Sequence, residues 1–95
     1  MPDNPFDDQA RKTIKRLFAG DPITAGAAER MLKQLGATLQ KKRGKGSHRR
    51  WKLPNGMKAP IPGKASSDLR YDVCRSLKAQ LIANNVTKDG GLKNE

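Results

Sequence analysis

His48 is the only histidine among the 95 residues of the chain. It lies in a run of glycines and basic residues, Gly44-Lys45-Gly46-Ser47-His48-Arg49-Arg50. Histidine changes its charge near neutral pH and can therefore carry a proton during catalysis, while lysine and arginine stabilise developing negative charge. Glycines let a backbone approach a phosphate closely, and a serine hydroxyl can donate to a phosphate oxygen. A lone histidine is more often structural than functional, but this setting favours chemistry on a phosphate ester.

The charge of the chain is concentrated around this run. Twenty Lys and Arg oppose nine Asp and Glu, which gives a net charge of +11, and residues 41–64 hold nine basic residues and no acidic one. Such a segment can be a merely solvated face, but its self-repulsion favours a polyanionic partner, above all nucleic acid. The predicted RNA contacts are Lys42, Arg43, Lys45, Gly46, Ser47, Arg50, Lys52 and Lys64.

The remaining composition narrows the class of protein. No apolar run approaches the length of a membrane-spanning helix, and the first residues lack the pattern of a signal peptide. Cys74 is the single cysteine, so neither an internal disulfide nor a cysteine-based metal cluster can form. We therefore expect a single small domain in the reducing cytoplasm, without a metal or cofactor and without a membrane partner.

Two helices are expected before the basic segment. Apolar residues recur at helical spacing over residues 7–19, with Asp7 and Asp8 at the favourable end and Gly20 as the stop. A second stripe is formed by Ala28, Met31, Leu32 and Leu35, with Thr24 as the N-cap and Gly36 as the stop.

Three strands are expected next. Residues 37–42 form the first, with Leu39 on its buried face, and residues 43–46 form a turn. The second covers residues 48–53, where alternation places His48, Arg50 and Lys52 on one face and Arg49, Trp51 and Leu53 on the other. Trp51 is therefore expected in the core. Pro54-Asn55-Gly56 predicts a tight hairpin into a third strand, residues 57–61, which Pro60 and Pro62 end.

A last helix completes the pattern. Its apolar stripe is Leu69, Val73, Leu77 and Leu81, with Cys74 and Ile82 beside it. Either Ser67 or Asp72 can cap it, and a frayed polar tail is expected from Asn84 onward. The order predicts an α+β fold: a three-stranded antiparallel sheet with helices packed on one face. We divide the chain into an N-terminal helical extension (1–22), the main domain (23–84) and a flexible tail (85–95).

This order of motifs resembles the HicA family of toxins, which are small mRNA interferases of toxin–antitoxin pairs. The residues that carry the resemblance lie between about 24 and 83: Met31-Leu32-Lys33-Gln34-Leu35-Gly36, Gly46-Ser47-His48, Asn55-Gly56, Ile61-Pro62, Leu69 and Leu77. The family's fold is similar to a double-stranded-RNA-binding domain, α-β-β-β-α, so residues 7–19 are an additional helix. Many members carry a further histidine after the third strand, where this chain has Gly63-Lys64.

The resemblance implies a metal-independent endoribonuclease in which His48 is the catalytic proton carrier. Its partners would be mRNA, a HicB-type antitoxin that covers the His48 face, and, as a further candidate, the ribosome. Because the chain has one histidine, Lys45, Ser47, a substrate group or water must supply the second proton transfer.

Two other functions remain open at this stage. The missing second histidine and the additional helix favour a non-catalytic RNA-binding module on the same fold. An interaction protein whose basic face binds an acidic protein also fits the charge distribution.

Overall fold

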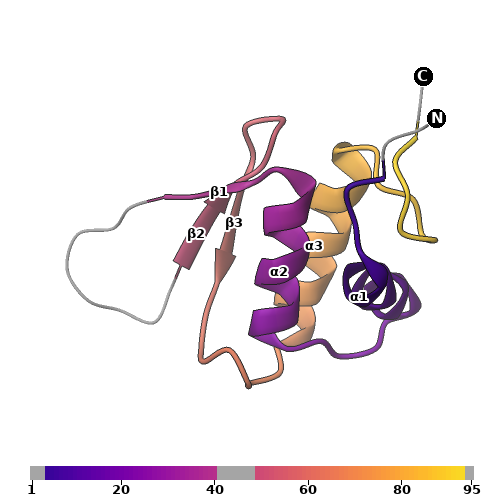
Figure 1. Ribbon diagram of the computed structural model, residues 1–95. Helices are drawn as coiled ribbons and strands as arrows, with labels where there is room; N and C mark the ends of the chain where they lie inside the picture. Colours follow the sequence, from indigo (N-terminus) through magenta and orange to yellow (C-terminus); the bar gives the residue numbers. More distant parts are fainter. Residues whose placement is uncertain (1–3, 41–48, 94–95) are drawn as a thin grey trace.

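The computed structural model describes residues 4–40 and 49–93 of the chain. Helices α2 and α3 lie between a small sheet and α1, so that the helices cover one face of the sheet only (Figure 1). The expected α+β architecture is confirmed. In chain order the elements are α1 (Asp8–Ala19), α2 (Ala25–Leu35), β1 (Thr38–Leu39), β2 (Arg49–Lys52), β3 (Lys58–Ile61) and α3 (Tyr71–Ala83).

The first two helices begin and end where the sequence predicts. Asp7 caps α1 by accepting a hydrogen bond from the Ala10 N–H at 2.8 Å, and Thr24 caps α2 by accepting from Ala27 at 3.1 Å. Such caps satisfy N–H groups that have no partner within the helix. Both helices end at a glycine in the left-handed region, Gly20 at φ 89° and Gly36 at φ 107°, where a side chain would be strained.

The sheet has the order β1-β2-β3, with both pairs antiparallel. The Leu53 N–H donates to the Met57 carbonyl at 2.7 Å, and the Gly56 N–H donates to the Leu53 carbonyl at 2.8 Å. The hairpin loop is thus the three residues 54–56, with Gly56 at φ 93° in the left-handed position that this loop type requires. The predicted hairpin is confirmed, and its register places Trp51 opposite Ala59.

The inner face of the sheet holds one half of the core. Trp51, Leu53, Ala59 and Ile61 are all buried in one cluster with the apolar stripes of the three helices. Gln80 of α3 ties the helix layer to the sheet, because its side-chain N–H group donates to the Lys58 carbonyl at 2.6 Å. The predicted inward orientation of Trp51 and Leu53 is therefore confirmed.

Two expectations for the strands were wrong. Leu39 is opposite Trp51 and shares its face, but its side chain is 50% exposed because β1 is a short edge strand beyond the helix layer. Pro60 does not end the third strand but lies within it, opposite Arg50. Proline is tolerated there because β3 is also an edge strand and pairs through one side only.

The start of α3 also differs from the expectation. Arg70 occupies the N-cap position without a side-chain cap, so neither Ser67 nor Asp72 caps the helix. The chain before it is held extended instead: the Ser67 carbonyl accepts from the Ala25 N–H and the Leu69 N–H donates to the Ile23 carbonyl, both at 2.9 Å. At the other end of the helix, Ile82 is 54% exposed and lies outside the buried stripe.

Both segments outside the main domain contribute to the same core. The N-terminal segment contributes Ile14 and Leu17 of α1, and Phe6 just before this helix, to the common buried cluster. The residues after Asn84 were expected to form a frayed tail, but those that the structure describes are folded. Up to Lys93 they turn back on themselves, with Val86 buried and bridged to Leu92. The boundaries at residues 22 and 84 stay predictions, but neither marks an end of the packed core.

Asp7 also connects α1 to α2. Its carboxylate accepts hydrogen bonds from Arg30 and Gln34, both at 3.0 Å. The hydrogen bond from the Ala10 backbone, followed by those from Gln34 and Arg30, lowers the pKa of Asp7 from 3.8 to about 2. All three stabilise the charged form.

This shift predicts a pH-dependent contribution to stability. Because the folded-state pKa is depressed, the contribution is complete above pH 3.8 and is lost as the pH falls towards about 2. Asp7→Asn keeps a good N-cap residue but removes the titration. We expect thermal unfolding followed by circular dichroism to show a steeper loss of Tm across this range in the wild type than in Asp7→Asn. Parallel curves for the two proteins would contradict the role of Asp7.

Candidate nucleic-acid interface

The predicted site is only partly within the described structure. Lys42, Arg43, Lys45, Gly46, Ser47 and His48 lie outside the described residues, whereas Arg50, Lys52 and Lys64 lie within them. The Gln40 N–H donates to the Arg50 carbonyl at 2.8 Å. The described residues on either side of residues 41–48 are therefore neighbours at one end of the sheet, and His48 is bonded directly to the first residue of β2.

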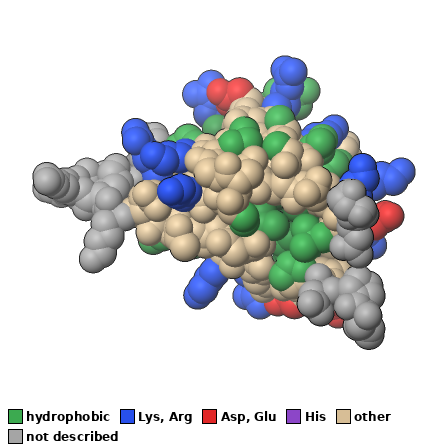
Figure 2. All heavy atoms as spheres, turned by 90° about the horizontal axis from the view of Figure 1, so that it is seen from above, with side chains coloured by type: hydrophobic (Ala, Val, Ile, Leu, Met, Phe, Trp, Pro, Cys, Tyr) green, Lys and Arg blue, Asp and Glu red, His purple; other side chains and the backbone are tan. Residues whose placement is uncertain are grey.

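The outer face of the sheet is open and basic. Arg50 and Lys52 of β2 point to this face, and Lys58 lies directly opposite Lys52. All three are exposed, and none of the helices α1, α2 and α3 packs on this face. We call these three residues the basic sheet face. Figure 2, in which the sheet lies toward the left as in Figure 1, shows a group of Lys and Arg side chains at that end of the molecule, and others along its remaining edges.

Lys58 is not among the RNA contacts predicted from the sequence. Its position follows from the hairpin register, because the three-residue loop at 54–56 pairs Lys52 with Lys58. Like charges directly opposite each other weaken a sheet unless a counter-charge is bound. The Asn55-Gly56 turn was the signal from which this pairing could have been found.

Glu29 of α2 supplies an anion to the opposite face of β2. Its Oε2 atom accepts a hydrogen bond from Arg49 Nε at 2.6 Å and another from Trp51 Nε1 at 2.9 Å. The Arg49 guanidinium also donates to the Gly63 carbonyl at 2.9 Å. The Glu29–Arg49 pair thus joins α2, β2 and the loop after β3, and the Glu29 side chain is only 18% exposed.

This arrangement gives Arg49 a structural role. Alternation along the strand predicts it on the inner face with Trp51, and it is not among the predicted RNA contacts. In the structure its guanidinium is paired with Glu29, which lies twenty residues earlier in the chain. Arg49 therefore serves as a structural tie, and the cations of the basic sheet face point the other way.

The chain was then compared with known proteins. The family model for the HicA toxin of bacterial toxin–antitoxin pairs matches residues 27–81. The match begins within α2, spans the whole sheet and ends within α3. The chain belongs to the HicA toxin family. It is thus the toxin component of a toxin–antitoxin pair, with an antitoxin as its partner. No curated protein and no solved structure matched the chain.

The N-terminus of α2 in this toxin is not available to bind an anion, because its first backbone N–H groups already have partners within the chain. The Ala25 and Gly26 N–H groups, at the start of α2, donate to the carbonyls of Ser67 and Ala65 at 2.9 Å. A helix N-terminus is otherwise a ready phosphate site. A side chain at Gly26 would meet the Ala65 carbonyl oxygen at 3.0 Å, so glycine permits this close approach. Lys64 is exposed on the same loop, next to Gly63.

Residues 4–40 and 49–93 contain no group of three His, Cys, Asp or Glu side chains that could hold a metal ion. Within the same residues, no helix is both long and apolar enough to cross a membrane.

Because Glu29 connects α2 to β2, we expect its substitution to lower the stability of the fold strongly. Glu29→Ala removes two charge-assisted hydrogen bonds, one from Arg49 and one from Trp51, and leaves the Trp51 indole N–H without this acceptor. We expect the free energy of unfolding, from urea denaturation, to fall by about 2 kcal/mol.

Arg30→Ala is the matched control, because it breaks an ion pair of the same helix whose arginine is 58% exposed. An exposed pair contributes below about 1 kcal/mol. Equal effects of the two substitutions would show that Glu29 has no special role.

Proposed function

We propose that this toxin is a metal-independent endoribonuclease that cleaves mRNA in the cytoplasm, with His48 as a proton carrier, and that a HicB-type antitoxin inhibits it. The observation that carries the proposal is the extent of the family match, which includes residues 41–48 and hence His48. The open basic sheet face beside the start of β2 supports it, because it suits the phosphate backbone of an RNA.

The chemistry needs no bound metal, because RNA carries its own nucleophile. A base removes the proton of the ribose 2′-hydroxyl, the 2′-oxygen attacks the adjacent phosphorus, and the bond to the 5′-oxygen breaks. The products are a 2′,3′-cyclic phosphate and a 5′-hydroxyl, which takes up a proton. His48 can carry one of these protons, and Lys45, Ser47 or water can serve in the other transfer. Lys42, Arg43 and Lys45 would stabilise the charged phosphorane.

In this proposal the basic sheet face binds the RNA on either side of the cleaved bond. Arg50, Lys52 and Lys58 are exposed on one surface, and Lys64 is exposed on the loop after β3. Contacts of lysine and arginine with phosphates carry no sequence information but set position and affinity. Gly46 and Ser47 would approach the phosphate at the cleaved bond.

The catalytic proposal is tested by His48→Ala. Expression of the wild type should arrest growth and produce cleaved mRNA, and His48→Ala should remove both effects. Loss of one general acid–base group lowers the rate by roughly 10²–10⁴-fold. RNA binding should persist, since the cations are unchanged. If His48→Ala still arrests growth and cleaves mRNA, the assignment of His48 is wrong.

A non-catalytic RNA-binding module is the second candidate, and the presence of a single histidine favours it. A measurement on the wild-type protein alone distinguishes the two functions. Incubation with RNA should yield 2′,3′-cyclic phosphate ends if the toxin cleaves. Salt-dependent binding without such ends would support the second candidate and exclude the first.

The substitution Lys58→Glu tests separately whether the basic sheet face binds RNA. Replacing one of two opposed lysines should raise the free energy of unfolding by roughly 0.2–1 kcal/mol. The same variant should bind RNA more weakly, with a salt slope smaller by about 0.7. Lys33→Glu, on α2, changes the net charge equally and serves as the control. Unchanged RNA affinity in Lys58→Glu at physiological salt would remove this face from the interface.

A further inference from the structure

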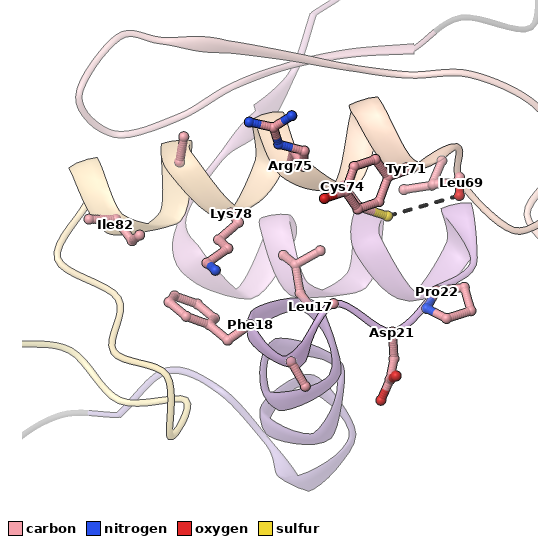
Figure 3. Close-up of a pocket in the computed structure, with 13 residues that line it drawn as sticks. Leu17, Phe18, Asp21, Pro22, Leu69, Tyr71, Cys74, Arg75, Lys78 and Ile82 are labelled. Carbon is pink, nitrogen blue, oxygen red and sulfur yellow. Dashed lines mark hydrogen bonds between the residues drawn. The ribbon is translucent and has the colours of Figure 1, made fainter.

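An open groove lies between α1 and α3, on the side of the helix layer away from the sheet. It has a volume of about 600 Å³ and is formed by the end of α1, the turn after it and one side of α3. Figure 3 shows Leu17 and Phe18 facing the side chains of α3 across it. A space of this size accepts several side chains of another molecule.

The floor of the groove is apolar. Leu17 and Leu69 are buried beneath it, and Cys74 lies beside them with its thiol directed at the Leu69 carbonyl. Burial raises the pKa of the Cys74 thiol, so this group stays neutral. Tyr71 and Ile82 stand at the rim and are 69% and 54% exposed. Large apolar side chains exposed together around an apolar floor are typical of a protein-binding surface.

The charged groups of the groove are mainly positive. The Arg75 guanidinium lies 5.7 Å from the centre of the Tyr71 ring, and the Lys78 ammonium lies 5.7 Å from that of Phe18. Both cations thus border the apolar surface while staying accessible. Asp21 is the one carboxylate among the lining residues. The groove therefore complements a segment that combines apolar side chains with carboxylates.

The groove depends on an element outside the family match. The match starts at residue 27, whereas α1 ends at Ala19. Without Leu17, Phe18 and the turn through Pro22, this side of α3 would be an open helix surface. The groove is thus a feature that α1 adds to the family fold.

We propose that the α1–α3 groove is a docking site for the partner antitoxin, and that it receives apolar side chains flanked by carboxylates. The proposal rests on the chain being a toxin with an antitoxin partner, and not on RNA cleavage. RNA is a poorer occupant, because the floor is apolar and Asp21 would repel a phosphate. A second copy of the chain is also disfavoured, because it would bring two cationic rims together on molecules of charge +11 each.

The test measures the affinity of the purified antitoxin, encoded with this toxin, for variants of the full-length chain. All chains carry His48→Ala so that they can be produced in quantity. Ile82→Asp and Arg75→Glu should each weaken antitoxin binding about tenfold or more, as loss of an interface anchor does. Lys33→Glu, which makes the same charge change as Arg75→Glu but on α2 outside the groove, should stay within about twofold.

The outcomes separate this proposal from its alternatives. Unchanged affinity in both groove variants would overturn it, and so would an equal loss in Lys33→Glu. Sedimentation that shows the toxin alone as a dimer, which Ile82→Asp dissociates, would assign the groove to a second copy instead. Ile82→Ser provides a milder variant if Ile82→Asp does not fold, with circular dichroism as the check.

RNA cleavage by Ile82→Asp and Arg75→Glu in the wild-type His48 background should match that of the unmodified toxin. A loss of cleavage in these variants would place the groove in the RNA site and overturn the proposal. If the unmodified toxin does not cleave RNA, the antitoxin measurement still decides the role of the groove, so the two proposals fail independently.

Discussion

The position of β2 depends on one carboxylate. Glu29 is held against the strand by Arg49 and Trp51, and Arg49 reaches on to the carbonyl of Gly63. A largely buried carboxylate destabilises a fold unless it is paired with a cation and hydrogen-bonded. Here Glu29 Oε2 has both, because it accepts hydrogen bonds from the Arg49 cation and from the neutral Trp51 indole. The contact fixes the start of β2 relative to α2 and to the loop after β3. In the sequence Arg49 directly follows His48, so this contact holds the residue next to the proposed catalytic histidine.

Along β2, side chains that face the core alternate with basic side chains that face outward. Trp51 faces inward and joins the core, whereas Arg50 and Lys52 face outward beside Lys58. Arg49 is on the inner face, where an unpaired cation would oppose burial, and Glu29 removes this conflict. Among residues 4–40 and 49–93, no carboxylate forms an ion pair with these outward cations, and Lys52 and Lys58 face each other. A surface of this kind is stabilised by binding a polyanion, so the fold and the proposed RNA interface are consistent with one another.

Local signals predicted most of the fold. Asp7, Thr24, Gly20 and Gly36 define helix ends through hydrogen bonds and backbone angles that depend only on near neighbours. The start of α3 could not be predicted in this way, since the pairing of residues 67–69 with residues 23–25 holds the chain extended there. The exposure of Leu39 likewise depends on how far the helix layer reaches. Alternation predicted correctly that Trp51 faces the core and that Arg50 and Lys52 face outward, whereas their role in RNA binding stays a prediction. The Glu29–Arg49 pair joins residues twenty positions apart and left no local pattern.

The position of α1 explains how one small domain can carry two surfaces. A chain of this size buries little apolar area, so an added helix that contributes Ile14 and Leu17 to the core is a substantial gain in stability. The helix must pack on the side of α2 and α3 away from the sheet, because the sheet occupies the other side (Figure 1). Packing there also creates the groove against α3. The basic sheet face and the exposed rim of the groove consist of different residues, so a change in the proposed docking segment of the partner can be matched at the rim without altering the cations of the sheet.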